Sequence, residues 1–206
     1  MRLDKSISRI AFVVEKSLKK CFPEDFDKRC MYAAFGMHIL AKQQKHDSII
    51  VAGGFAALTV ARDNSNATYQ GYNDGDGEFG HYWCEIDGHT VDLGPSFLPV
   101  SSRFPAAPAP LIMWPLSKEL PASLRYAPKI RYHTDVQPQM ADDIMQRLEW
   151  FLKICDQKYA TLHGQPKVKS WVLSGPSAIA TAAAKGDIWA NGSMRIETMP
   201  RQDVPL

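Results

Sequence analysis

Apolar residues recur at helical spacing in several parts of the chain. In residues 5–20 the apolar positions are spaced by three, four and seven, which predicts an amphipathic helix. From Cys30 to Ala41 nearly every position is apolar, a pattern that predicts a helix buried at the centre of the fold. A further helix is expected from about Gln139, and another begins at Pro176, because proline is favoured in a first helical turn.

Other segments have the composition of β-strands. Residues 48–62 (SIIVAGGFAALTVAR) predict one or two strands, and shorter strands are expected at 66–72 and 168–173. Eight prolines lie in residues 94–128, so a long irregular excursion over the surface is expected at about 95–128. The apolar residues expected to anchor it are Phe97, Phe104, Leu111 and Trp114. The last twenty residues are polar and are expected to be peripheral.

Size and charge narrow the class of protein. A chain of 206 residues has the size of one domain, so we expect residues 1–206 to form a single unit. The 24 basic and 22 acidic residues nearly balance, which gives no reason to expect a nucleic-acid partner. The apolar run at 10–14 is too short for a signal-peptide core, and no segment approaches the roughly 20 apolar residues of a membrane span. We therefore expect a cytoplasmic protein without a membrane partner or a cofactor.

The four cysteines are too far apart for the usual cysteine motifs. No C-x-x-C spacing is present, so neither a zinc ribbon nor a thioredoxin-type redox site is indicated. In a cytoplasmic chain all four are expected to be reduced thiols. Cys84 and Cys155 occupy apolar faces and are expected to pack in the core. Cys21 is a weaker candidate nucleophile than Cys30, because no buried helix follows it immediately.

Residues 79–93 (FGHYWCEIDGHTVDL) predict a β-hairpin in which Asp87 and the following glycine form a two-residue type I′ turn. Counting outward from this turn places Trp83 opposite Asp92. Because side chains alternate between the two faces of a strand, His81 shares a face with Trp83 and lies diagonal to Asp92. Diagonal neighbours lie roughly 7–8 Å apart at the backbone, a gap that a histidine and an aspartate can close to a hydrogen bond.

A histidine held by a carboxylate in this way is suited to act as a general base. The carboxylate fixes the tautomer of His81 and raises its basicity, while Trp83 shields the pair. Cys30 is the expected nucleophile, because the helix that it opens has a dipole that favours a thiolate. The amide N–H of Cys30 lacks a helical acceptor and can bind an oxyanion. The expected roles are Cys30 as nucleophile, His81 as base, and Asp92 as the residue that orients His81.

The stretches RCMYAAFGMHILA, IIVAGGF and HYWCEIDGHTVDLGP together resemble the transglutaminase-like branch of the papain-fold superfamily. In that branch a cysteine opens a helix, and an H-x-W-x-E stretch, a short turn and an aspartate follow. The matching positions here are His81, Trp83, Glu85 and Asp92. The proline that commonly follows the aspartate is displaced to Pro95. The resemblance covers about residues 25–96, and the whole chain also resembles an uncharacterised bacterial papain-fold family.

The resemblance implies an α+β, papain-like cysteine proteinase fold, with a buried helix starting at the cysteine and packed on an antiparallel sheet that carries the histidine and the aspartate. The catalytic core would span about 21–96, and further helices and a strand would span about 138–186. The implied activity is that of a cysteine peptidase or amidase on a small-molecule or peptide substrate, through an acyl-enzyme. Acyl transfer to an amine, as in a transglutaminase or an N-acyltransferase, and a non-catalytic binding module on the same fold both stay open. The segment CFPEDFDKR before Cys30 contains no glutamine, which papain-like enzymes usually place there to complete the oxyanion hole.

Metal binding is a weaker interpretation of the same residues. A site made of Cys30, His81, Cys84 and His89 is disfavoured, because His81 and Cys84 point to opposite faces of their strand. The acidic loop at 73–80 resembles a calcium loop, but Phe79 stands where an EF-hand needs glycine. We therefore expect no metal. The histidines that have no partner evident from the sequence, and are expected to be structural, are His38, His46, His133 and His163.

Overall fold

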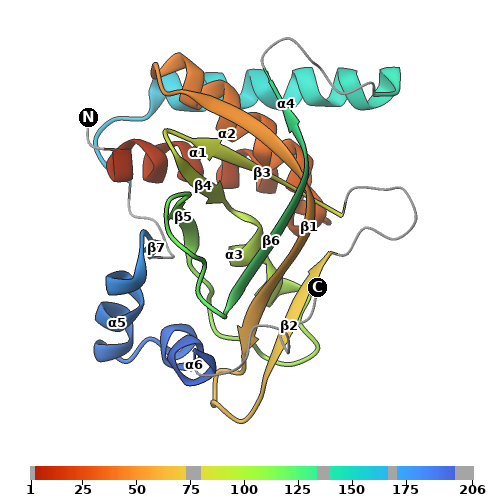
Figure 1. Cartoon of the computed structure of the whole chain (residues 1–206). Coiled ribbons are helices and arrows are strands. Elements are labelled where there is room, and N and C mark those ends of the chain that lie inside the picture. Colours follow the sequence, from red (N-terminus) through yellow and green to blue (C-terminus); the bar gives the residue numbers. More distant parts are fainter. Residues whose placement is uncertain (1–2, 73–79, 134–139, 167–170, 198–206) are drawn as a thin grey trace.

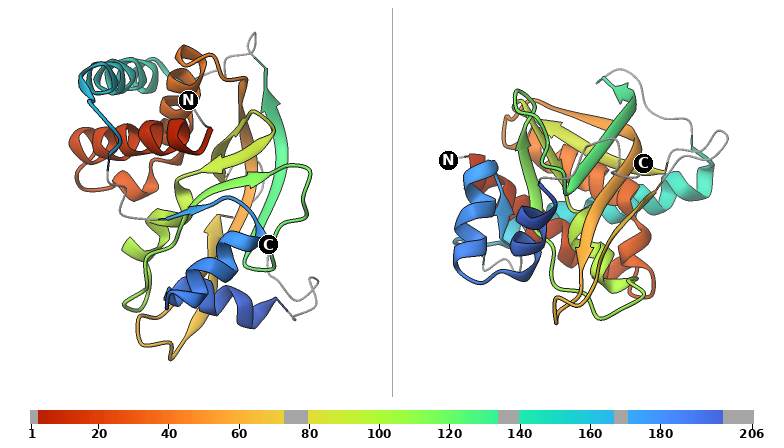
Figure 2. Two further views of the ribbon diagram at one scale, coloured as in Figure 1. Left: turned by 90° about the vertical axis from the view of Figure 1, so that its left-hand side faces the viewer. Right: turned by 60° about the horizontal axis from the view of Figure 1, so that its bottom comes forward.

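A computed structural model of the protein describes residues 3–72, 80–133, 140–166 and 171–197. It is an α+β structure with one curled, mixed β-sheet (Figure 1). Helices α1 (Leu3–Cys21), α2 (Cys30–Gln43) and α4 (Asp142–Thr161) pack against one another at one end of the molecule (Figure 2). Within these ranges, no helix is both long and apolar enough to cross a membrane.

The sheet is built almost entirely from antiparallel pairs. Its strands are β1 (Ser48–Val60), β2 (Ala67–Tyr72), β3 (His81–Ile86), β4 (His89–Asp92), β5 (Leu111–Pro115), β6 (Leu124–Tyr132) and β7 (Val172–Leu173). The order across the described sheet is β2-β1-β3-β4-β5-β7, with β6 also paired to β1. Strands β5 and β7 run parallel, so the sheet is mixed.

Strand β1 is paired along both edges. Its first half pairs with β3 and its second half with β2, while residues 50–57 pair with β6. The residues of β1 that pair with β6 include some that pair with β3 and some that pair with β2. Strand β6 must therefore lie along the opposite edge of β1 from β2 and β3. Side chains of β6 nevertheless reach the hairpin of β3 and β4, because Tyr126 donates to Asp92 and Arg131 donates to Glu85.

The short helices occupy two places. The helix α3 (Gly94–Phe97) and the 3-10 turn η2 (Leu98–Val100) follow β4 directly, and the turn η1 (Phe26–Lys28) precedes α2. Helices α5 (Pro176–Ala184) and α6 (Ile188–Ile196) pack together at the far end of β1 (Figure 1). Trp189 is fully buried there, and its indole N–H donates to the carbonyl of Leu58 at 2.8 Å. The prediction that the last twenty residues are peripheral is therefore wrong for 187–197, and residues 198–206 lie outside the described ranges.

The prediction that about 95–128 forms a long irregular excursion is also wrong in part. The segment contains α3, strand β5 and the start of β6. Phe97, Leu111 and Trp114 are buried, as expected of residues that anchor this segment, and Phe104 is half-buried. Prolines concealed the strands: Pro128 lies within β6 opposite Gly53, where the register of the pair shifts. A proline can be accommodated at such an irregularity, where a regular ladder hydrogen bond is not required.

The helices predicted from periodicity are confirmed. The first two correspond to α1 and α2, the helix expected from about Gln139 is α4, and α5 begins at Pro176. Helix α2 has many buried residues and packs on β3, as its all-round apolarity indicated. The segment at 48–62 forms one strand rather than two. The α+β class is thus confirmed, and the hairpin that carries His81 and Asp92 lies directly against the helix that begins at Cys30.

Candidate active site

The hairpin of β3 and β4 has the predicted turn and register. Asp87 and Gly88 have φ angles of 44° and 72°, the positive values that a type I′ turn requires. Cys84 lies opposite Val91, as expected from counting outward. The predicted diagonal contact is confirmed, because Nε2 of His81 lies 2.7 Å from Oδ2 of Asp92.

The Asp92 carboxylate accepts hydrogen bonds from three sides. Besides His81, the Tyr126 hydroxyl donates to Oδ2 at 2.7 Å, and the Gly94 amide donates to Oδ1 at 2.7 Å. Asp92 is only 3% exposed, so these donors replace the water that would otherwise solvate its charge. The carboxylate is consequently fixed at both oxygens.

Gly94 is needed because the chain passes very close to His81. A Cβ atom at this position would lie 2.5 Å from Cε1 of His81 and 3.1 Å from Oδ1 of Asp92. Distances below 3 Å exclude any side chain unless the imidazole moves. The glycine therefore allows its own amide to reach Asp92.

Aromatic rings enclose the His81 imidazole. It is fully buried and stacks on Phe55 with ring centroids 4.5 Å apart, while the Trp83 ring lies 6.0 Å away. Burial alone would disfavour the imidazolium, but the charge and hydrogen bond of Asp92, together with Cys30, raise the pKa of His81 to about 10. Trp83 is 2% exposed and lies beside the pair, in the shielding position predicted for it.

Cys30 is the first residue of α2 and is half-buried. Burial opposes its ionisation, but the hydrogen bond and charge of His81 and a hydrogen bond from the Tyr82 backbone lower the pKa of the thiol. The other three cysteines differ, because burial raises the pKa of Cys21, Cys84 and Cys155. The structure thus brings Cys30, His81 and Asp92 together in a line, which we call the Cys30 site.

The arrangement can support nucleophilic chemistry at a carbonyl carbon. A thiolate beside an imidazolium is the reactive form of a cysteine nucleophile, and the imidazolium can deliver a proton to a leaving group. The first amides of α2 have no acceptor within the helix and point in the direction that favours an anion.

The acidic segment before Cys30 is partly neutralised. Arg29 binds Asp25 through two nitrogens, one of them at 3.1 Å, and its guanidinium lies over the rings of Phe22 and Tyr32. Asp25 is therefore paired with Arg29, and its charge opposes an oxyanion near Cys30 less than an unpaired carboxylate would.

Two aromatic residues of the site were not predicted. Phe55 belongs to β1 and Tyr126 to β6, and both lie outside the sequence stretch that carries His81 and Asp92. The apolar run of β1 was recognised as a strand, but periodicity does not say which residue faces His81. Tyr126 falls in the proline-rich segment for which no strand was expected, so no pattern in the sequence indicated its role.

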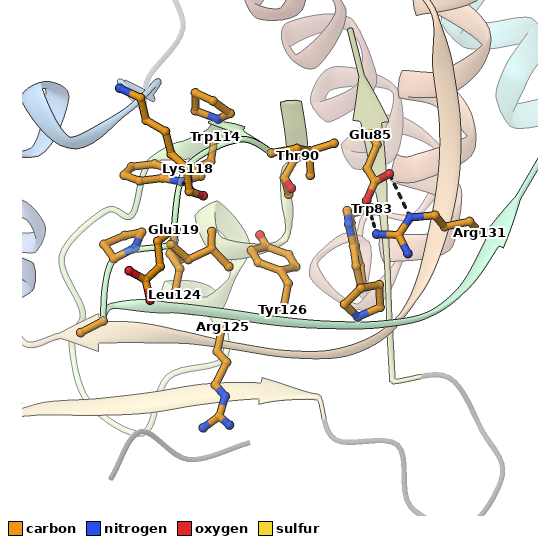
Figure 3. Close-up of a pocket in the computed structure, with 16 residues that line it drawn as sticks. Trp83, Glu85, Thr90, Trp114, Lys118, Glu119, Leu124, Arg125, Tyr126 and Arg131 are labelled. Atoms are coloured by element: carbon orange, nitrogen blue, oxygen red, sulfur yellow. Dashed lines mark hydrogen bonds and ion pairs between the residues drawn. The ribbon is translucent and has the colours of Figure 1, made fainter. Parts of the chain in front are cut away.

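A cavity of about 500 Å³ lies beside the rings of Trp83 and Tyr126. Figure 3 shows its lining, with Trp83 and Tyr126 on one side and the ion pair of Glu85 and Arg131 beside them. The Arg131 guanidinium contacts both carboxylate oxygens of Glu85, at 2.9 and 3.1 Å. Since Trp83 and Tyr126 also contact His81 and Asp92, they form the wall between the cavity and the Cys30 site.

A second line of three polar residues lies elsewhere. The Ser6 hydroxyl is 2.8 Å from Nε2 of His46, and Nδ1 of His46 is 2.6 Å from Oδ2 of Asp87. The prediction that His46 has a purely structural role named no partner, and these two are its partners. We call these residues the Ser6 cluster. Ser6 lies in α1 and has no exposed surface, so a substrate cannot reach its hydroxyl.

The metal arrangements considered from the sequence receive no geometric support. Cys84 is buried on the other face of β3, where its thiol donates to the Ala34 carbonyl at 3.1 Å. Among the described residues, no group of three or more His, Cys, Asp or Glu side chains is placed to hold a metal ion. The acidic loop at 73–79 lies outside the described ranges.

Comparison with known proteins gives one informative likeness. No family model and no curated protein matches the chain. A solved structure described as the crystal structure of genomics APC5867 superimposes with a TM-score of 0.50 and 20% sequence identity. The match covers 80% of this chain and 82% of that one. At this identity the likeness concerns the fold alone, and the chemistry of the site has to be argued from its own residues.

Proposed function

We propose that this protein is a cysteine hydrolase of the papain-like, transglutaminase-like type, acting on an amide or a thioester through an acyl-enzyme. The observation that carries the proposal is the line of Cys30, His81 and Asp92, with 2.7 Å between Nε2 of His81 and Oδ2 of Asp92. The packing of α2 on β3 supports the papain-like part of the proposal, because the helix presents its N-terminal cysteine to the hairpin.

In the first half of the reaction the Cys30 thiolate attacks the substrate carbonyl carbon. The carbonyl electron pair moves to oxygen, and the Cys30 amide binds the resulting oxyanion. The imidazolium of His81 then protonates the leaving amine or thiol, the bond to the leaving group breaks, and Cys30 is left as a thioester.

In the second half, neutral His81 removes a proton from water as the water attacks the thioester. The tetrahedral intermediate collapses to a carboxylic acid, and the Cys30 sulfur leaves as a thiolate beside the protonated His81. An amine in place of water would give an amide by the same steps, so a transferase shares this site. The fate of the acyl group separates the two, and it is read as acid or amide when a p-nitrophenyl ester is supplied with and without a primary amine.

The four cysteines provide the direct test. Iodoacetamide alkylation of each is followed by mass spectrometry between pH 5 and 9, in the wild type and in His81→Ala. Because only Cys30 has a lowered pKa, it should react fastest at pH 6 and lose that advantage in the variant. The buried thiols of Cys84 and Cys155 report whether the variant has unfolded. A Cys30 that reacts no faster than a model thiol would exclude the enzyme and leave a binding module on the same fold.

A further inference from the structure

Tyr126 stands between the cavity and the Cys30 site. It lies in β6 opposite Phe55 of β1, and its ring centroid is 5.1 Å from those of both Phe55 and Trp83. The rest of its ring faces the cavity, as Figure 3 shows. The ring is thus held on two sides, which directs the hydroxyl toward Asp92.

The hydroxyl shares one carboxylate oxygen with His81. Tyr126 donates to Oδ2 of Asp92 at 2.7 Å, and Nε2 of His81 lies 2.7 Å from the same atom. Burial and the Asp92 charge raise the pKa of Tyr126, so the phenol stays protonated and remains a donor. Oδ1 is held separately by Gly94, which keeps the carboxylate in place.

We propose that Tyr126 is a positioning residue for Asp92, and that its hydroxyl limits the basicity of His81 by sharing the carboxylate oxygen that His81 uses. A donor to the carboxylate stabilises it most when His81 is neutral, because the imidazolium then no longer balances the negative charge. Removing this donor destabilises the state with neutral His81, and the imidazole should become more basic.

The consequence for catalysis rests on the proposed function. His81 has to be basic enough to keep Cys30 ionised, yet acidic enough to protonate the leaving group. The charge and hydrogen bond of Asp92 outweigh burial and favour the first requirement, and the Tyr126 hydroxyl shifts the balance toward the second. In Tyr126→Phe we therefore expect Cys30 to be alkylated at lower pH, while acylation by an amide with a poor leaving group slows.

The test measures His81 directly and does not need a substrate. The imidazole of His81 is titrated by NMR in Cys30→Ala and in Cys30→Ala/Tyr126→Phe. Removing the thiol also removes its share of the raised pKa of His81, which brings the titration closer to neutral pH. We expect the pKa of His81 to rise by roughly 0.5–1 unit when the hydroxyl is removed.

Tyr69→Phe is the matched control. Tyr69 is also a partly buried tyrosine, and its hydroxyl donates to the Ala122 carbonyl at 2.9 Å, away from Asp92. In the Cys30→Ala background its substitution should leave the His81 titration unchanged. An unchanged or lowered pKa of His81 in the Tyr126→Phe variant, or an equal rise in the control, would overturn the proposal.

Fluorotyrosine at position 126 covers the case in which Tyr126→Phe does not fold. Fluorine leaves the shape of the ring almost unchanged but makes the phenol a stronger donor. The pKa of His81 should then fall, the opposite sign from the phenylalanine variant, and a rise or no change contradicts the proposal. If Cys30 of the wild type proves unreactive, the proposed enzyme is lost, while the His81 titrations still decide the role of Tyr126.

Discussion

Two places in this molecule align a side chain that can be a nucleophile, a histidine and an aspartate. In the Cys30 site and in the Ser6 cluster alike, the three residues follow the same order along the chain, and each aspartate lies within 2.7 Å of a histidine nitrogen. The Ser6 cluster even places a serine hydroxyl 2.8 Å from the other nitrogen of the ring.

The Cys30 site and the Ser6 cluster differ in which of their residues are buried. Asp92 is 3% exposed whereas the Asp87 side chain is 37% exposed, so water screens the contact between Asp87 and His46 but not the pair of Asp92 and His81. Access is reversed too, because Cys30 is half-buried at a helix start, while Ser6 is fully buried within α1. On the function proposed above, aligned donors and acceptors are insufficient for a reactive site, which also needs a buried charge pair and a nucleophile that is not fully buried.

The largest difference should appear when the same substitution is made in both aspartates. Asp92→Asn removes the charge that supports the His81 imidazolium, so Cys30 alkylation at pH 6 should fall roughly a hundredfold. Asp87→Asn should change that rate less than twofold, because Asp87 touches His46 and not His81. Equal losses in the two variants would show that the difference in environment has no effect on reactivity.

Glycine substitutions separate damage to the Cys30 site from loss of stability. Gly94→Ala and Gly192→Ala each force a Cβ against a neighbour, at 2.5 Å from His81 and 2.6 Å from Val60 respectively. Both should lower the free energy of unfolding by about 1–3 kcal/mol, as overpacking generally does. Only Gly94→Ala should also slow Cys30 alkylation. Urea unfolding and alkylation on the same samples check this, and a slowed Cys30 in both variants would contradict it.

The pH dependence of stability should expose the coupling of Cys30 to His81. The raised pKa of His81 gives a stabilisation that is complete below about pH 6.5 and is lost as the pH rises toward about 10. The lowered pKa of Cys30 gives one that is complete above its ordinary value of about 9 and is lost as the pH falls.

Wherever the Cys30 thiolate and the His81 imidazolium coexist in the folded state below about pH 9, the two effects cancel, because the folded state holds one proton on His81 and the unfolded state holds one on Cys30. The Cys30 site should therefore add no pH dependence to the stability of the wild type in that part of the range. Cys30→Ala removes the contribution of Cys30 and leaves that of His81. The free energy of unfolding of this variant should therefore decline with rising pH by up to about 1.4 kcal/mol per unit relative to the wild type. Urea unfolding at half-unit pH steps measures the difference, and parallel curves would refute the coupling.

The smallest effect is expected in the Ser6 cluster. Ser6→Ala removes one hydrogen bond to His46 and should cost about 1 kcal/mol of stability or less, with no change in Cys30 alkylation. A fluorophosphonate should leave Ser6 of the wild type unlabelled, because the hydroxyl is buried. Labelling at Ser6 would mean that α1 opens enough to make this cluster reactive.

The sequence predicts the Cys30 site well where its geometry is local. The Asp87–Gly88 turn sets the register of one hairpin, and side-chain alternation then determines that His81 meets Asp92. Cys30 could be chosen because a helix start has distinctive electrostatics and the apolar run after it is long.

The remaining residues of the site depend on contacts between distant segments. Tyr126 is 34 residues from Asp92, and the Pro128 that follows it conceals the strand. Ser6 and Asp87 are 40 and 41 residues from His46, and periodicity carries no information over such separations. Strand pairing and helix packing bring these groups together, and neither can be derived from a local pattern.

The pairing of β1 along both edges has a consequence for biosynthesis. Cys30, His81 and Asp92 leave the ribosome before β6, so a growing chain contains all three residues of the Cys30 site while one edge of β1 still lacks its partner. An unpaired edge strand readily associates with other chains, so aggregation is a hazard during this interval. We expect Cys30 to gain its final reactivity only when residues 124–132 have docked, and alkylation of ribosome-stalled chains of increasing length would show when that occurs.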